Sequence, residues 1–177
     1  MGRKQVIGSW VRSVRCEGDG ADARAGQLTG FGLNCSQRHY LPGFAPLVTC
    51  EIAGTDPSSG TFVLGAHFDS RGVRPASTLS PYAHPAQQSF GYPTAPGADD
   101  DGSGTALLLS IARHISSHRL TFRRKVVLAA FSGEEQGLLG SNFLAREMRE
   151  RGEDVVLMVQ ADMIGEFRVG RGGERRN

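Results

Sequence analysis

The chain has 177 residues, a length that suits one domain with a sizeable core. Its net charge is only +2, which gives no basic field for nucleic acid. No apolar run approaches the ~18 residues of a membrane span, and the start lacks the roughly 7–15-residue apolar core of a secretory signal. We therefore expect no nucleic-acid or membrane partner. The protein is either intracellular, or secreted with a signal peptide that precedes this chain.

The first half of the chain predicts two strands and a long loop. Residues 1–45 are poorly defined, with glycine, alanine and charge spread through them. Residues 46–53 (PLVTCEIA) and 61–66 (TFVLGA) read as strands on either side of a turn, which predicts a hairpin. Residues 71–96 hold five prolines and many small polar residues, so we expect a long loop there.

The second half alternates helices and strands. Residues 103–118 and 140–151 have helical spacing of their apolar residues. Residues 125–131 (KVVLAAF) and 155–161 (VVLMVQA) are unbroken apolar runs, which are typical of strands buried on both faces. Residues 167–177 form a basic tail. The order of elements predicts an α/β fold.

Cysteines give little guidance. Cys16, Cys35 and Cys50 make an odd count, and no two of them form a CxxC pair. Buried free thiols and a single disulfide are both compatible with this pattern.

Acidic residues or a histidine follow the three later predicted strands or precede the first helix. In α/β sheets, functional groups gather beyond the carboxyl ends of the strands, so these side chains should meet at one edge. Clustered carboxylates repel one another unless a cation lies between them. The six candidates for a metal site are His67, Asp69, Asp100, Glu134, Glu135 and Asp162.

The residue types suggest how the work is divided. His67 suits zinc, and Asp69 could accept the other ring N–H and so fix the tautomer. Asp100 suits a carboxylate that bridges two metals, because glycines nearby let the backbone come close. Of Glu134 and Glu135, one could bind metal and the other act as general base. The competing interpretations are structural hydrogen-bonding groups and a surface glutamate pair. The sequence contains no GxSxG or HExxH motif.

The segments GAHFDS, PGADDDGSG, EEQGLLGS and DMIG, in this order, resemble the two-zinc aminopeptidases of the bacterial and fungal leucine-aminopeptidase type. The resemblance covers about residues 47–166. It implies a zinc exopeptidase fold, a mixed and mostly parallel sheet flanked by helices, and release of N-terminal residues from peptides. It also implies individual roles: His67 and Asp162 would hold one zinc, Glu135 the other, and Asp100 would bridge them, with Glu134 as base and Asp69 orienting His67.

The chain departs from that family at its end. The family has a further histidine ligand downstream of DMIG, whereas residues 163–177 contain no histidine. Residues 46–166 therefore resemble a catalytic domain that is incomplete at its C-terminus, with a weakened second zinc site. His84 in the long loop is a remote substitute, and His39, His114 and His118 are expected at the surface.

Other functions on the same fold stay open. The chain could be a catalytically impaired fragment or a non-catalytic interaction domain. It could also be a related zinc enzyme, such as a carboxypeptidase or a glutaminyl cyclase. The preferred N-terminal residue and the oligomeric state do not follow from the sequence.

Overall fold

The computed structural model describes residues 28, 30–70 and 97–165. Within them, five strands form one mixed sheet in the order β1-β2-β4-β3-β5. The strands are β1 (Asn34–Arg38), β2 (Leu47–Ile52), β3 (Thr61–His67), β4 (Lys125–Phe131) and β5 (Val155–Gln160). Two α-helices lie wholly within the described residues, α3 (Gly102–Ser117) and α4 (Leu139–Glu150), and a short 3-10 turn, η1, spans Pro57–Ser59. The predicted loop 71–96 with His84, the basic tail and Cys16 lie outside the described residues.

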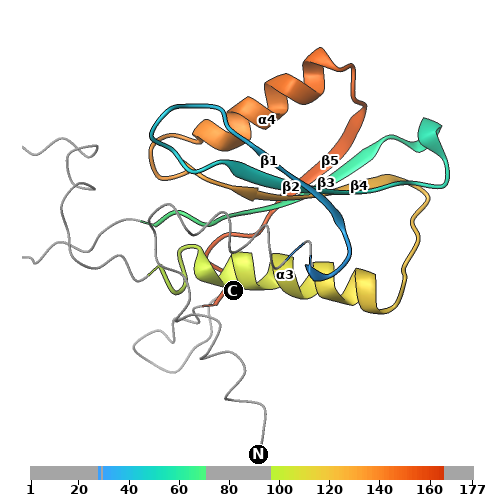
Figure 1. Ribbon diagram of the computed structural model, residues 1–177, viewed down its shortest axis with the longest axis horizontal. Coiled ribbons are helices and arrows are strands. Elements are labelled where there is room, and N and C mark those ends of the chain that lie inside the picture. Colours follow the sequence, from blue (N-terminus) through green and yellow to red (C-terminus); the bar gives the residue numbers. More distant parts are fainter. Residues whose placement is uncertain (1–27, 29, 71–96, 166–177) are drawn as a thin grey trace, which may run out of the picture.

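The sheet is covered on both sides, as Figure 1 shows: α4 lies on one face and α3 on the other. Leu108, Ala112 and Ile115 of α3 pack with Leu64 and Leu128 in one buried cluster. On the opposite face, Leu144 and Met148 of α4 pack with Val63, Val127 and Phe131. Alternate residues of β3 and β4 thus enter opposite clusters, as the two-residue period of a strand requires. The predicted α/β architecture with a mixed sheet between helices is confirmed.

The predicted hairpin between residues 46–53 and 61–66 is wrong. β2 does not pair with β3, because β4 lies between them, antiparallel to β2 and parallel to β3. The segment between β2 and β3 therefore crosses over a strand position that a later part of the chain fills. The turn residues near η1 predict a change of chain direction after β2, but they do not determine which strand pairs with β2.

Two further features differ from expectation. β1 lies within the stretch that the sequence left undefined, and it pairs antiparallel with β2. Cys35 and Cys50 face each other in this register and form a disulfide, which decides between the two possibilities for these cysteines. Among the described residues, no helix has both the length and the apolar character needed to cross a membrane.

β5 also departs from expectation. Its run of apolar residues predicts a strand buried on both faces, yet every residue of β5 is exposed. β5 pairs in parallel with β3 and, within the described residues, with no other strand. The prediction of a strand is correct, and the prediction of its burial is wrong.

Candidate metal centre

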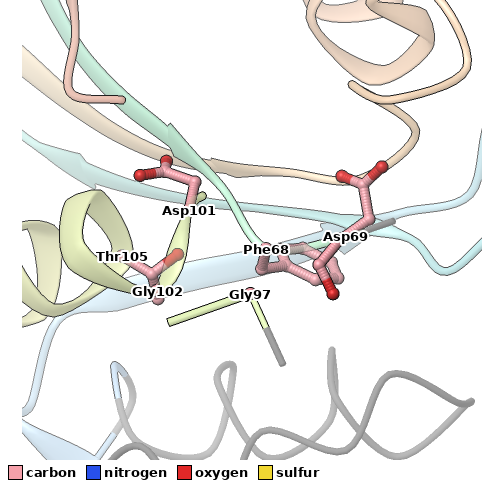
Figure 2. Close-up of a pocket in the computed structure, with 7 residues that line it drawn as sticks. Phe68, Asp69, Gly97, Asp101, Gly102 and Thr105 are labelled. Atoms are coloured by element: carbon pink, nitrogen blue, oxygen red, sulfur yellow. The ribbon is translucent and has the colours of Figure 1, made fainter. Parts of the chain in front are cut away.

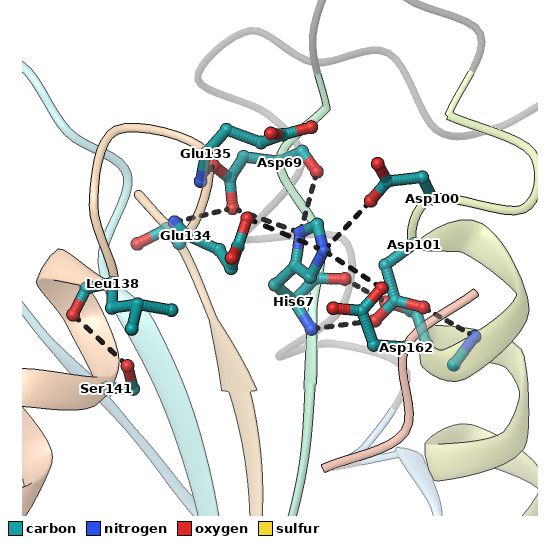
Figure 3. A network of polar contacts seen from close by, with 12 residues as sticks. His67, Asp69, Asp100, Asp101, Glu134, Glu135, Leu138, Ser141 and Asp162 are labelled. Carbon is teal, nitrogen blue, oxygen red and sulfur yellow. Dashed lines mark hydrogen bonds and ion pairs between the residues drawn. The ribbon is translucent and has the colours of Figure 1, made fainter.

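His67 lies at the end of β3 and is the centre of an acidic cluster (Figure 3). Its side chain is 1% exposed. The ring atom Nε2 lies 3.1 Å from Oδ1 of Asp100, 3.8 Å from Oδ1 of Asp162 and 3.8 Å from Oε2 of Glu134. One imidazole nitrogen therefore faces three carboxylates that arrive from three different segments of the chain.

The ring nitrogen that faces the carboxylates makes no hydrogen bond within the described residues, although it is buried. Its 3.1 Å contact with Asp100 is a close ionic approach without hydrogen-bond geometry. Buried polar atoms rarely lack a partner, and an imidazole nitrogen beside carboxylate oxygens is a set of ligand atoms that zinc accepts. Ligand atoms of His67, Asp100 and Asp162 all lie within 4.8 Å of one another, close enough to share one ion. The residues therefore fit a divalent metal.

The other ring nitrogen of His67 is held by the chain itself. Nδ1 lies 3.0 Å from the backbone carbonyl oxygen of Asp69 and 3.6 Å from its carboxylate. The shorter contact has the geometry of a hydrogen bond, so the Asp69 carbonyl is the partner that leaves Nε2 available to a metal. The backbone of His67 is fixed as well, because its carbonyl accepts a hydrogen bond from the Thr105 hydroxyl at 2.8 Å.

The Asp69 carboxylate organises the turn after β4. It accepts hydrogen bonds from the backbone N–H groups of Glu134 at 3.2 Å and Glu135 at 3.1 Å. Burial alone would raise the pKa of Asp69, but its contacts with His67 and these two N–H groups outweigh that and lower the pKa. Asp69 thus ties the two glutamates to the end of β3.

The turn that carries the glutamates is also held from outside. The Tyr40 hydroxyl donates to the carbonyl oxygen of Ser132 at 2.9 Å. Gly133 has a φ of +69°, and a Cβ there would approach the Tyr40 hydroxyl to 2.6 Å, so the turn needs glycine at this position. The chain reverses at Gly133 directly after β4 and presents Glu134 to His67.

Asp101 is a site residue that sequence reasoning missed. It is 1% exposed and caps α3, where Oδ1 accepts from the Gly104 N–H at 2.9 Å. Its Oδ2 accepts from the His67 backbone N–H at 3.0 Å. One carboxylate therefore joins the start of α3 to the end of β3. Its position three residues before Gly104 is the spacing of a helix N-cap, which was the available signal.

The electrostatics follow from this crowding. Burial would lower the pKa of His67, but Asp69, Asp101 and Glu134 outweigh it and raise the pKa to about 9. Burial raises the pKa of Asp101 to about 6 despite its two backbone donors. Burial also raises the pKa of Glu134, and its acidic neighbours add to the effect. Excess negative charge surrounds one imidazole, which is an arrangement that a divalent cation would relieve.

Of the six predicted residues, the structure brings His67, Asp100 and Asp162 into one metal-binding group and places Glu134 and Asp69 against His67. Glu135 is adjacent but does not belong to that group. His39, His114 and His118 are exposed, as predicted. A small pocket beside the cluster is lined by seven residues, three of which, Asp69, Asp101 and Thr105, also contact His67 (Figure 2). The three metal-binding candidates do not line that pocket.

Comparison with known proteins identifies the family. Residues 48–171 match Peptidase family M28. This chain belongs to that family. A protein named "Probable zinc metalloprotease" from Pyrenophora tritici-repentis is 33% identical over 166 residues, which are 94% of this chain and 31% of the relative. "Leucine aminopeptidase 1" of Sclerotinia sclerotiorum is 37% identical over 121 residues, which are 65% of this chain and 28% of the relative.

A solved structure shows the same fold. LapB from Legionella pneumophila superposes with a TM-score of 0.70 at 22% sequence identity, covering 95% of this chain and 44% of LapB. The M28 chain described here thus spans about a third of the length of its curated relatives and less than half of LapB.

Proposed function

We propose that this chain carries the catalytic residues of a zinc-dependent aminopeptidase that releases N-terminal residues from peptides. The observation that carries the proposal is the buried Nε2 of His67, which has no hydrogen-bond partner in the described part of the chain and faces Asp100, Asp162 and Glu134. The family match and the leucine aminopeptidase relative support the choice of reaction.

His67, Asp100 and Asp162 are the residues that would hold the first zinc ion. Zinc in such a site supplies Lewis acidity and lowers the pKa of water. The Asp69 carbonyl oxygen accepts the Nδ1 proton of His67 in a hydrogen bond, so Nε2 stays available to bind the metal. Asp100 would also bridge to a second ion held by Glu135. We expect that ion to bind more weakly, because Glu135 and the shared Asp100 would be its only ligands among the predicted site residues, whereas zinc sites usually have three or four protein ligands.

Glu134 is the general base in this proposal. Its carboxylate lies within 3.8 Å of the His67 ring, and its backbone is fixed by Asp69. The pKa of Glu134 is raised, which moves it towards the pH at which the enzyme would work. A base with such a pKa can accept a proton from the attacking water and return it to the leaving amine. In this proposal Glu134 transfers the proton, while Asp100 and Asp162 stay ionised as metal ligands.

A calorimetric zinc titration of this chain tests the metal site. One tight zinc should bind to the parent, and His67→Ala should weaken that binding by about 100-fold or more, because it removes the one nitrogen ligand of the group formed by the described residues. His39→Ala, at an exposed histidine, is the matched control and should bind as the parent does. Two equally tight ions in the parent would contradict the weaker second site.

Activity assays test the reaction. Glu134→Gln should keep zinc affinity but lower turnover of an aminoacyl anilide by about 10²–10⁴-fold, as expected for loss of a general base. Blocking the substrate amine should abolish turnover by the parent. Hydrolysis of blocked peptides, or cyclisation of an N-terminal glutamine, would favour the related zinc enzymes instead.

A further inference from the structure

Two side chains at the start of α3 hold the segment that follows β5. The backbone N–H of Gly165 donates to Oδ1 of Asp99 at 2.7 Å, and the N–H of Ile164 donates to the Ser103 hydroxyl oxygen at 3.0 Å. That hydroxyl donates in turn to the Asp99 carbonyl oxygen at 2.8 Å. Asp99 and Ser103 therefore act together as one acceptor pair for two consecutive backbone groups.

This contact matters because Asp162 has little other support. The last backbone bond between β5 and β3 runs from the Ala161 N–H to the Gly65 carbonyl at 2.9 Å. Asp162, Met163, Ile164 and Gly165 are all exposed, so apolar packing among the described residues does little to fix their path. The position of Asp162 is thus set from one side by the Ala161 bond and from the other by the Asp99–Ser103 pair.

The glycines of the two motifs fit the same contact. A Cβ on Gly165 would approach Oδ1 of Asp99 to 3.0 Å and the Ser103 Cβ to 3.1 Å. A Cβ on Gly104 would approach the Ala161 carbonyl oxygen to 2.3 Å. The start of α3 and the end of β5 therefore approach as closely as the backbone allows, and larger side chains would separate them.

We infer that Asp99 and Ser103 are positioning residues, which hold Asp162 against Asp100 and His67 by fixing the backbone two and three residues beyond it. This inference rests on the proposed function, in which Asp162 is a metal ligand. It assigns no metal contact to Asp99 or Ser103. Groups that orient a ligand in this way commonly change metal affinity about 10–100-fold when they are removed.

The test measures zinc affinity by calorimetry for Asp99→Ala, Ser103→Ala and Gly165→Ala. Each should weaken the tight zinc by about 10-fold or more. Asp99→Asn keeps an oxygen that can accept from Gly165, so its affinity should stay within about threefold of the parent. Rescue by asparagine would separate positioning by a hydrogen bond from an effect of charge.

Matched controls come from the same residue types elsewhere. Ser110→Ala removes a hydroxyl of α3 that donates to the Ala106 carbonyl of the same helix, and Asp56→Ala removes the N-cap of η1 and its ion pair with Arg123. Both should leave zinc affinity unchanged. Thermal unfolding of all variants shows whether a loss of zinc affinity reflects a general loss of stability. We expect Asp99→Ala to unfold no more readily than Asp56→Ala.

Amide hydrogen exchange in the metal-free chain gives a readout that does not depend on zinc. Asp99→Ala should speed exchange at Gly165, and Ser103→Ala should speed it at Ile164, by about 10-fold or more. Faster exchange with unchanged zinc affinity would overturn the inference and leave the proposed function standing. If the parent binds no zinc, the proposed function fails. Unchanged Asp162 chemical shifts in Asp99→Ala would then overturn the inference separately, and altered shifts would support it.

Discussion

β4 and β5 are almost indistinguishable as sequences, yet they occupy opposite environments. The six residues from Val126 to Phe131 in β4 are 0–7% exposed, whereas the five apolar residues of β5 are 39–54% exposed. β4 lies between β2 and β3, and clusters built on α3 and α4 cover its two faces. β5 has one described neighbour, β3. An apolar run specifies a strand, and its neighbours decide whether that strand is core.

The contrast between β4 and β5 indicates which strands contribute most to the stability of this chain. Burial removes apolar surface from water at about 25 cal/mol per Å², so the same side chain contributes very differently in the two strands. The metal-binding candidates fall on both sides of this divide. His67 is the last residue of the buried strand β3, and Asp162 follows the exposed strand β5. One ligand is fixed by the core, and the other depends on local hydrogen bonds.

The largest expected difference is in stability. Leu128→Ala should lower the free energy of unfolding by about 2–5 kcal/mol, because it opens a cavity beside fully buried neighbours. Leu157→Ala should cost less than about 1 kcal/mol, since Leu157 is 54% exposed. Urea unfolding followed by circular dichroism measures both. Equal losses would mean that β5 is packed in solution.

The same contrast shows how far the sequence goes. Periodicity and apolar runs located β3, β4, α3 and α4 closely, because local patterns determine local conformation. The order of the strands in the sheet could not be predicted from these local patterns, since β4 lies between β2 and β3 but comes from a distant part of the chain. Exposure of β5 did not follow either, because a strand's sequence does not encode what covers it.

The site was predictable to the extent that topology dictated it. The rule that strand ends share one edge correctly brought His67, Asp100 and Asp162 together. The run of three aspartates was read as a single ligand with two neighbours, so the capping role of Asp101 was missed. The division of work between Glu134 and Glu135 stays a prediction, since adjacent residues in a turn carry no pattern that separates them.

A second difference should appear in amide hydrogen exchange. Amides of β4 should exchange only in rare large-scale openings, while those of β5 open locally at an edge. We expect at least about 100-fold faster exchange in β5, equivalent to about 3 kcal/mol of opening free energy. NMR of the metal-free chain measures it residue by residue. Similar protection in both strands would indicate an additional partner for β5.

β5 should also promote association between copies. An uncharged edge strand with apolar side chains on both faces can pair with another chain, and a charge on such an edge opposes pairing. Leu157→Lys or Met158→Lys should raise the concentration at which oligomers form by about tenfold or more, since each removes roughly 1.5–3 kcal/mol of apolar burial from a paired edge. Light scattering across a concentration series measures the effect. Arg113→Ala, a surface change on α3, is the control and should leave the onset unchanged.

The smallest expected effect concerns how the start of β5 is attached. Oε1 of Glu153 lies 2.9 Å from Nζ of Lys125 in β4, and it accepts a hydrogen bond from the Thr61 hydroxyl of β3 at 2.8 Å. Burial alone would raise the pKa of Glu153, but these partners lower it. A lowered folded-state pKa means that the stabilisation is fully present above the unfolded pKa of about 4.3 and is lost as pH falls through the lower folded-state pKa.

Glu153→Gln should therefore cost about 0.2–1 kcal/mol at pH 7, as expected for a partly exposed ion pair, and less at pH 3. Unfolding free energies measured across this pH range test the sign. An equal cost at both pH values would show that the Thr61 hydrogen bond, and not the charge, attaches β5. A cost larger than that of Leu157→Ala would show that β5 depends on its polar start more than on its apolar side chains.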